Sequence, residues 1–346
     1  MRWLDSGRLD VFEYQRIAWP SFSFAGTIGG VEDATITMNG GSSLKVSGAM
    51  RICGGMDFKN DLVRIVSTSS IGDETEKIVH ATLFATSPTE DHAVGNARAG
   101  VNLYSTLVVL EKKRVRSSLR IPGGTNVVEW CAKLVRSLKL PCTYTPSSVC
   151  LSAERIYDRD TTYLTVVNEM LDVANYASAM VNGYGGVILA PYQNPAKKAP
   201  SRVLSKNRDN VLMSEFTVEK DWFDIPNVVS LVCSNTDRSM SATAEFDDAR
   251  SFLSTKNRYE VTYTEQVDDC ASQAALNAKA RSRLQDKLSY AERAKVVHPY
   301  LPESIGDVWE LDFEDYETRG SIYEKVIRMT PGMRTDTTVR RIIDVG

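Results

Sequence analysis

The sequence contains few histidines, no cysteines spaced for zinc, and none of the common catalytic loop motifs. Only three histidines occur in 346 residues, and the six cysteines include no CxxC pair. Paired Cys and His at short spacing are the usual ligands of a structural zinc ion. No HExxH motif, EF-hand loop, GxxxxGK loop or GxSxG elbow is present either. These absences disfavour most metalloenzymes, P-loop ATPases and serine hydrolases of the common folds.

The sequence also lacks a surplus of positive charge and a long apolar run. It has 41 Lys and Arg against 44 Asp and Glu, which gives a formal net charge of -3. No basic field is therefore available to hold nucleic acid or an anionic membrane. Apolar runs such as Leu107–Leu110 and Val187–Ala190 are far shorter than the ~20 residues of a membrane-spanning helix. With no signal peptide and scattered cysteines, the sequence predicts a chain made in a reducing cytoplasm.

The first ~115 residues have the patterns of β-structure. Ala34–Met38 and Ser43–Ser47 alternate apolar and polar residues on either side of Asn39-Gly40-Gly41, which predicts a hairpin. Further short β-branched runs occur, and one of them is Leu103–Leu110. Several closely spaced strands with Gly-rich turns indicate a small barrel or sandwich.

The pattern becomes helical after residue 121. Asn126 and Glu129 form a capping box at the start of one predicted helix, which Pro141 ends. A second predicted helix runs from about Thr162 to about Asn175 and is followed by a hairpin with a Gly-rich turn. These elements predict a compact α+β module between two β-rich regions.

Strand patterns return towards the end of the chain, interrupted by an Ala-rich helix near 271–288. The sequence therefore predicts an α+β, mostly β protein with two β-barrel domains and an intervening α+β module. The predicted first barrel covers residues 1–117, the α+β module 118–205, and the second barrel 206–346, with the helix near 271–288 inserted in it.

Three stretches of the sequence together resemble the baseplate or tail hub family of phage tails and contractile injection systems, which includes the late control protein D type. The first is Ile121–Leu138 (IPGGTNVVEWCAKLVRSL). The second is Asp158–Leu189, a predicted helix followed by a hairpin. The third is Ala274–Phe313, a predicted helix and two strands, the second entered through GDVW.

This resemblance implies a structural function. Hub proteins of the family are trimers whose subunits each contribute two similar tube-like barrels, so that the ring is pseudo-hexameric. The implied partners are the tail tube protein, distal tail or baseplate proteins and a central spike or tip protein, with genomic DNA as transient cargo in the channel. The implied location is the virion, after assembly in the host cytoplasm. The family supplies no catalytic residues, so we expect a protein that is not an enzyme. From the missing motifs we also expect no bound metal or cofactor.

An acidic cluster lies at and after the predicted strand Trp309–Phe313, and its members are Glu310, Asp312, Glu314, Asp315 and Glu317. Glycosidases and metal sites need carboxylates that converge across a cleft. Here acidic and apolar residues alternate along the strand, so we expect one solvated strand face. In a hub, this face could line the channel and repel DNA phosphate.

The helix near 271–288 carries a basic stripe, formed by Lys279, Arg283 and Lys287 at spacings of four residues. Nucleic-acid binding is one interpretation, but no aromatic residues interleave to stack on bases. We expect a solvated helix face, on the outside of the ring or at a subunit contact, and a channel lumen that is neutral to acidic.

Other patterns have simpler explanations. Asp158 and Asp160 are typical of acids at a helix start, and the Ser42-x-x-Lys45 spacing lacks the partner motifs of a lactamase-type site. Gly183-x-Gly185-Gly186 is predicted to lie in a hairpin, where no helix N-terminus can hold a phosphate. His298 ends a predicted strand, so we expect it to pack or to face solvent.

The alternative function is a tail-tip module that binds or cleaves host cell-wall glycan or peptidoglycan. A glycan binder needs exposed aromatic residues close together in loops, and Trp19, Trp222 and Trp309 do not cluster in the sequence. The expected placement of acids on strand faces also favours the structural function.

Overall fold

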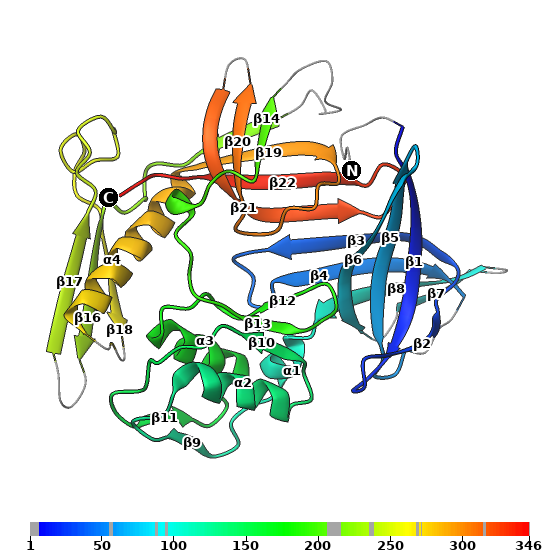
Figure 1. The fold of residues 1–346 in the computed structure, drawn as a ribbon, viewed down its shortest axis with the longest axis horizontal. Helices are drawn as coiled ribbons and strands as arrows, with labels where there is room; N and C mark the ends of the chain where they lie inside the picture. Colours follow the sequence, from blue (N-terminus) through cyan, green and yellow to red (C-terminus); the bar gives the residue numbers. More distant parts are fainter. Residues whose placement is uncertain are drawn as a thin grey trace.

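A computed structural model describes residues 7–54, 58–86, 89–93, 96–205, 216–234, 239–267, 270, 272–313 and 316–345. The described chain is mostly β-structure (Figure 1). It also contains α1 (Val108–Lys112), α2 (Val127–Ser137), α3 (Tyr163–Val173) and α4 (Gln273–Leu288), and the 3-10 turns η1 (Pro195–Lys197) and η2 (Ser289–Ala291).

Most strands belong to one 14-stranded sheet. These strands are β1 (Leu9–Ala18), β2 (Ser23–Thr27), β3 (Val31–Asn39), β4 (Val46–Cys53), β5 (Leu62–Ile71), β6 (Glu74–Ala85), β7 (Thr89–Ala93), β8 (Asn96–Ser105), β14 (Arg202–Ser205), β15 (Phe216–Lys220), β19 (Glu292–Pro299), β20 (Val308–Phe313), β21 (Tyr316–Arg328) and β22 (Arg334–Arg341). The hydrogen-bonded order is β15-β19-β22-β21-β3-β4-β8-β6-β5-β1-β2, while β7 pairs with β8, and β20 pairs with β14 and β21.

The two β-rich regions do not form two closed barrels, which corrects the expectation of separate barrels. They are joined because β21 is long enough to pair with β20 in its first half and with β3 in its second, from Glu324 to Arg328. Ile36 of β3 and Ile327 of β21 are directly opposed and both fully buried. One hydrophobic core therefore contains residues from both regions. Alternating strand patterns look the same in an open sheet and in a barrel, so the sequence could not distinguish them.

The α+β module has its own hydrophobic core, built from α1, α2, α3 and the short strands around them. These strands are β9 (Ser118–Ile121), β10 (Cys142–Tyr144), β11 (Arg155–Asp158), β12 (Met180–Val181) and β13 (Val187–Leu189). As the capping pattern predicts, the Asn126 side chain accepts a hydrogen bond from the Glu129 backbone amide at 3.0 Å. Thr162 caps α3 in the same way through the amide of Thr165.

Two local predictions in the first region were wrong. The strand expected over Leu103–Leu110 ends at Ser105, and α1 begins at Val108, because Leu107 and Leu110 turn into the core of the α+β module. The hairpin strand expected to begin at Ser43 begins at Val46, because the connection extends to Lys45, which has a φ of 61°.

The glycine-rich turn between β12 and β13 joins the α+β module to the large sheet. The hydroxyl of Thr82 donates to the Gly183 carbonyl at 2.8 Å, and that of Thr106 donates to the Gly185 carbonyl at 2.8 Å. A Cβ on Gly183 would lie 2.2 Å from the carbonyl oxygen of Val79 in β6. The loop is a hairpin turn, as predicted, and its glycines allow close backbone contact between module and sheet.

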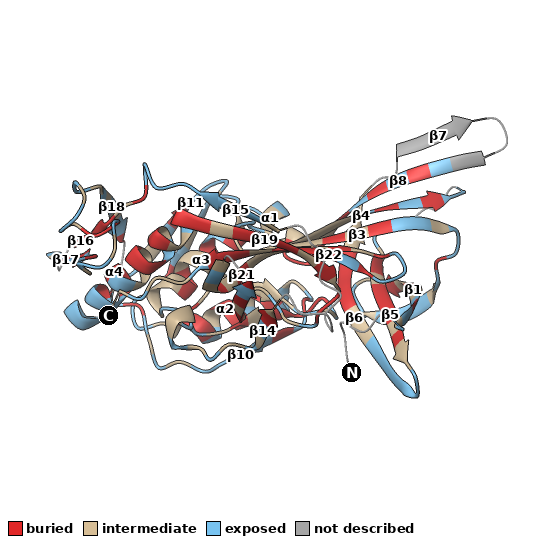
Figure 2. Ribbon diagram, turned by 90° about the horizontal axis from the view of Figure 1, so that it is seen from above, coloured by how far each residue is buried: buried red, intermediate tan, exposed pale blue. Residues whose placement is uncertain are grey.

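A third hydrophobic cluster lies between α4 and a small sheet of β16 (Val228–Ser234), β17 (Ser239–Glu245) and β18 (Thr262–Val267). The helix expected near 271–288 begins at Gln273 and lies across this small sheet (Figure 1). Seen from above, buried residues run through the large sheet, the α+β module and α4 (Figure 2).

The core of the large sheet contains buried titratable residues. Lys325 of β21 is 1% exposed, and its ammonium group donates to the carbonyls of Leu301 and Glu303. Burial lowers the pKa of Lys325 from 10.5 to about 7, although the charge of Glu303 opposes this shift.

His298 is fully buried at the end of β19, hydrogen-bonded to Thr337, and burial lowers its pKa to about 3. His298 therefore packs, one of the two outcomes expected for it.

We predict that stability rises with pH between 7 and 8.5 because of Lys325. In that range the unfolded chain binds a proton that the folded chain has partly released, so the free energy of unfolding increases by roughly 1 kcal/mol per pH unit. Urea unfolding of wild type and Lys325→Met at the two pH values measures this slope. The slope should fall in Lys325→Met, whatever the absolute stability of that variant, and should persist in the control Lys133→Met. Equal slopes in all three proteins would contradict the prediction.

Candidate functional site

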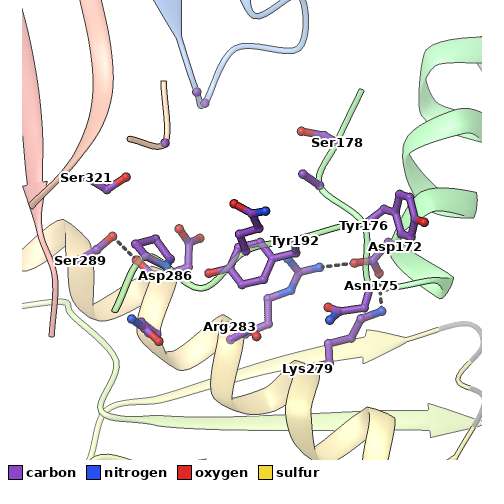
Figure 3. A pocket seen from close by; sticks show the side chains of 18 of the residues that line it. Asp172, Asn175, Tyr176, Ser178, Tyr192, Lys279, Arg283, Asp286, Ser289 and Ser321 are labelled. Atoms are coloured by element: carbon purple, nitrogen blue, oxygen red, sulfur yellow. Dashed lines mark hydrogen bonds and ion pairs between the residues drawn. The ribbon is translucent and has the colours of Figure 1, made fainter. Parts of the chain in front are cut away.

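A cavity of about 870 Å³ lies where the α+β module, α4 and the strands β21 and β22 meet (Figure 3). The module contributes the end of α3 and the segment that follows it, including Asp172, Tyr176 and Tyr192. One face of α4 contributes Lys279 and Arg283. The cavity is thus lined by residues from all three parts of the fold.

A cluster of ion pairs joins α3 to α4 at one end of this cavity. Asp172 lies at the C-terminal end of α3, where its Oδ2 is 2.6 Å from Lys279 Nζ and its Oδ1 is 3.1 Å from an Arg283 nitrogen (Figure 3). Glu265 of β18 lies 3.3 Å from the same guanidinium. Although burial opposes its charged form, these carboxylates raise the pKa of Arg283. Burial also raises the pKa of Tyr192 to about 12, so its phenol stays neutral.

The basic stripe on α4 is therefore not a solvated face, which corrects that expectation, while its expected place on the outside of the ring or at a subunit contact stays a prediction. Lys279 is only 6% exposed and, like Arg283, is paired with a carboxylate of the same chain. The Lys287 ammonium lies 3.9 Å from the centroid of the Tyr263 ring. The prediction that these three residues share one face of the helix is correct. Nothing in the sequence indicates that α3 places an acidic residue against that face.

At another part of the cavity wall, Arg340 of β22 is held between two tyrosines. Its guanidinium carbon lies 3.5 Å from the centroid of the Tyr290 ring and 3.1 Å from that of Tyr323. Arg340 is 6% exposed, and its Nε has no hydrogen-bond partner among the described residues. Nearby, Lys45 donates to the carbonyl of Gly40 at 2.7 Å. No sequence motif marks this arrangement.

The acidic strand face agrees with its prediction where the structure describes it. Trp309, Leu311 and Phe313 of β20 are buried, Glu310 is partly exposed and Asp312 is exposed. Glu314 and Asp315 lie outside the described residues, and Glu317 is exposed on the next strand. Among the residues that the structure describes, no group of three or more His, Cys, Asp and Glu is arranged to hold a metal ion.

The remaining candidates occupy turns. Asp158 ends β11, and Asp160 has a φ of 69° in the turn before α3. Ser42 lies in the turn between β3 and β4, and Lys45 at the end of this turn makes the contact with Gly40 already described. None of the helices in the described part of the chain combines the length and apolar surface needed to cross a bilayer.

Sequence reasoning missed one aromatic cluster. Trp222 packs edge-on against Phe252, with ring centroids 4.6 Å apart, and both are partly exposed together with Phe223 and Tyr259. These residues come from two loops about thirty positions apart. Of the tryptophans considered from the sequence, Trp309 is buried in the sheet core, while Trp19 packs on Phe84.

We predict that Asp172→Asn lowers the free energy of unfolding by about 1–3 kcal/mol, because it leaves Lys279 buried without its carboxylate while solvent partly screens Arg283. Chemical unfolding measures the loss. Adding Lys279→Met to Asp172→Asn should recover part of it. The control Glu154→Gln breaks an exposed pair with Arg120 and should change little. If Asp172→Asn and Glu154→Gln have the same effect, the ion pairs do not stabilise the junction.

Comparison with known proteins identifies the fold. No family model matches the sequence, and no curated protein matches it. Among solved structures, a tail protein from Neisseria meningitidis MC58 aligns over 96% of this chain and 97% of its own, with a TM-score of 0.69 and 11% identity. The 43 kDa tail protein of prophage MuSo2 from Shewanella oneidensis aligns over 95% and 98%, with a TM-score of 0.66 and 9% identity. A prophage tail protein from Listeria monocytogenes EGD-e aligns over 95% and 94%, with a TM-score of 0.59 and 9% identity.

The chain therefore has the fold of phage tail proteins, over nearly the full length of each. The resemblance predicted from the sequence is confirmed at this level. A component of the type VI secretion system from Escherichia coli, described as structurally similar to phage T4 tail proteins, shares the fold as well, with a TM-score of 0.52 over 91% of this chain.

Proposed function

We propose that this protein is a structural hub protein of a phage tail or a related injection machine, and not an enzyme. The observation that carries the proposal is the match in fold to three tail proteins along almost the whole chain. A match of this extent covers the large sheet, the α+β module and the α4 region together. The ion pairs in the cavity support the proposal, because they hold the parts of the subunit together.

We further propose that three copies form a pseudo-hexameric ring, to which each copy contributes its two β-rich regions, residues 1–117 and 206–346, as similar parts of the wall, together with the module 118–205. The large sheet supports assembly, because β2 and β15 at its two ends each have one described neighbour. Next to one of these ends, Leu9 and Val11 of β1 and Phe24 of β2 are 59–64% exposed. Open strand edges beside apolar side chains are typical of surfaces that another chain covers.

In this proposal the ring joins the tail tube and the distal tail or baseplate proteins to a central spike or tip protein, in a virion assembled in the host cytoplasm. Genomic DNA passes through the ring as transient cargo. Glu310 and Asp312 are candidates for a lumen surface, because a wall without unpaired cations does not add salt-dependent affinity for DNA. The inward pairing of Lys279 and Arg283 is consistent with a neutral to acidic lumen.

We predict that the purified protein, alone at high concentration or mixed with its tube protein, reaches three times the chain mass of 38.4 kDa. Light scattering measures the mass. Val11→Lys with Phe24→Lys should shift the population to monomer, because each change places a charge in the apolar contact. Ile156→Lys, which changes an exposed apolar residue of the α+β module, is the matched control. A strict monomer under both conditions would exclude the trimer.

The exposed aromatic pair of Trp222 and Phe252, with Phe223 and Tyr259 also exposed on the same two loops, favours one second candidate, a tail-tip module that binds host cell-wall glycan. Aromatic faces close together in loops are what a sugar ring would stack on, and Lys220 lies 5.9 Å from the centroid of the Trp222 ring.

The hub proposal predicts that the protein neither binds purified cell wall nor releases fragments from it. Co-sedimentation and analysis of soluble fragments measure both. Binding that is lost in Trp222→Ala and kept in Trp19→Ala would support the glycan module instead. Release of fragments that stops after a single carboxylate change would show an enzyme.

A further inference from the structure

Arg340 is a buried cation for which the described part of the chain supplies no matching anion. It is 94% buried, and no carboxylate of the described residues lies within 4.0 Å of its guanidinium. Its guanidinium carbon lies between the rings of Tyr290 and Tyr323, whose planes are inclined by 61° to each other, and this aromatic pair contributes cation–π attraction but no negative charge. The N–H groups of a guanidinium lie at the edge of its plane, and one of those of Arg340, on Nε, has no hydrogen-bond partner among the described residues.

Other cations around the same cavity are matched within the chain. Asp172 pairs with Lys279 and Arg283, and Glu292 lies 3.1 Å from Arg341, the neighbour of Arg340 in β22. Lys198 donates to the Gly306 carbonyl. Arg340 therefore differs from Lys279, Arg283 and Arg341, the cavity cations that have a carboxylate partner.

Lys45 also lines the cavity, and none of the described carboxylates pairs with it. Gly40 donates its amide to the Tyr323 carbonyl at 2.8 Å, and Lys45 donates to the carbonyl of the same Gly40. Lys45 is partly buried, which lowers its pKa, and its hydrogen bond to the Gly40 carbonyl uses one of its three donors. The turn between β3 and β4 thus brings Lys45 to the part of the cavity where Tyr323 covers Arg340.

We propose that the end of the cavity lined by Arg340 and Lys45 binds an oxyanion, a carboxylate or phosphate group that neutralises the buried positive charge of Arg340. The planar fork of a guanidinium matches two oxygens of such a group, and the stacking tyrosines fix its orientation before binding. Ser321 is paired with Arg340 in the register of β21 and β22, so its hydroxyl lies on the same face and points into the cavity (Figure 3).

Two sources can supply this chemistry. One is a free small anion, and the other is an acidic side chain on a polypeptide segment. The volume of about 870 Å³ accommodates either, since it is far larger than one hydrated ion and within the range of sites for larger ligands. The inference does not depend on the hub function, because it rests on the subunit alone.

The experiment titrates the full chain with inorganic phosphate and, separately, with an N-acetylated, amidated octaglutamate peptide, both at constant ionic strength. Calorimetry gives the affinity, and the ¹⁵N spectrum of arginine Nε–H groups gives a direct readout of the site. The Arg340 resonance is assigned as the one absent in Arg340→Lys. We expect this resonance to shift on titration, and Arg340→Gln to weaken binding by at least about tenfold.

Two further variants keep the test decisive. Lys45→Asn removes the second cation with a residue that tolerates the positive φ of this position, and should weaken binding if Arg340→Gln fails to fold. Arg341→Gln changes the adjacent, exposed arginine, which has its own carboxylate, and should leave binding unchanged. A stronger response to phosphate would identify a free anion as the ligand, and a stronger response to the peptide an acidic segment. If neither probe shifts the Arg340 resonance, or if all variants bind as wild type does, the proposal is wrong.

Discussion

The structure depends on β21 being shared between neighbours. Its residues pair with β22 on one side, and with β20 and then β3 on the other, around a bulge between Ile322 and Glu324. Through this one strand, segments nearly 290 residues apart in the sequence belong to the same sheet and the same core. Pairing of such distant segments costs loop-closure entropy before any contact forms. The pairing must therefore be stabilised by apolar burial where β21 meets β3, which we call the joint.

The close fit between β21 and β22 shows how that burial is achieved. A Cβ at Gly320 would lie 2.3 Å from a methyl carbon of Val339 and 2.7 Å from the Arg340 carbonyl. The absence of a side chain at Gly320 therefore lets the Val339 side chain pack directly over the neighbouring strand. At the same joint the buried Lys325 donates hydrogen bonds to two backbone carbonyls, and the charge of Glu303 favours its protonated form. Together they compensate only in part for the loss of water.

The sequence predicted elements well and their assembly less well. The helix cap at Asn126, the start of the second helix near Thr162, the glycine turn at Gly183 and the strand alternation around Trp309 depend on residues that are close in sequence. These predictions were correct. The open sheet and the environment of the α4 stripe depend on partners more than 100 residues away, such as Asp172 for Lys279. A single sequence contains no signal for those pairings, because the periodicity of a helix or strand is the same whichever surface covers it.

The cavity could not be predicted for the same reason, because the residues that line it lie far apart in the sequence. Val339 and Arg340 are neighbours in β22, and the pleat of the strand directs them to opposite faces of the sheet. Val339 packs in the core that joins the two β-rich regions, whereas Arg340 faces the cavity between the sheet, α4 and the α+β module. A group that binds Arg340 therefore contacts β22, the strand that pairs with the shared strand β21 from Gly320 to Ile327.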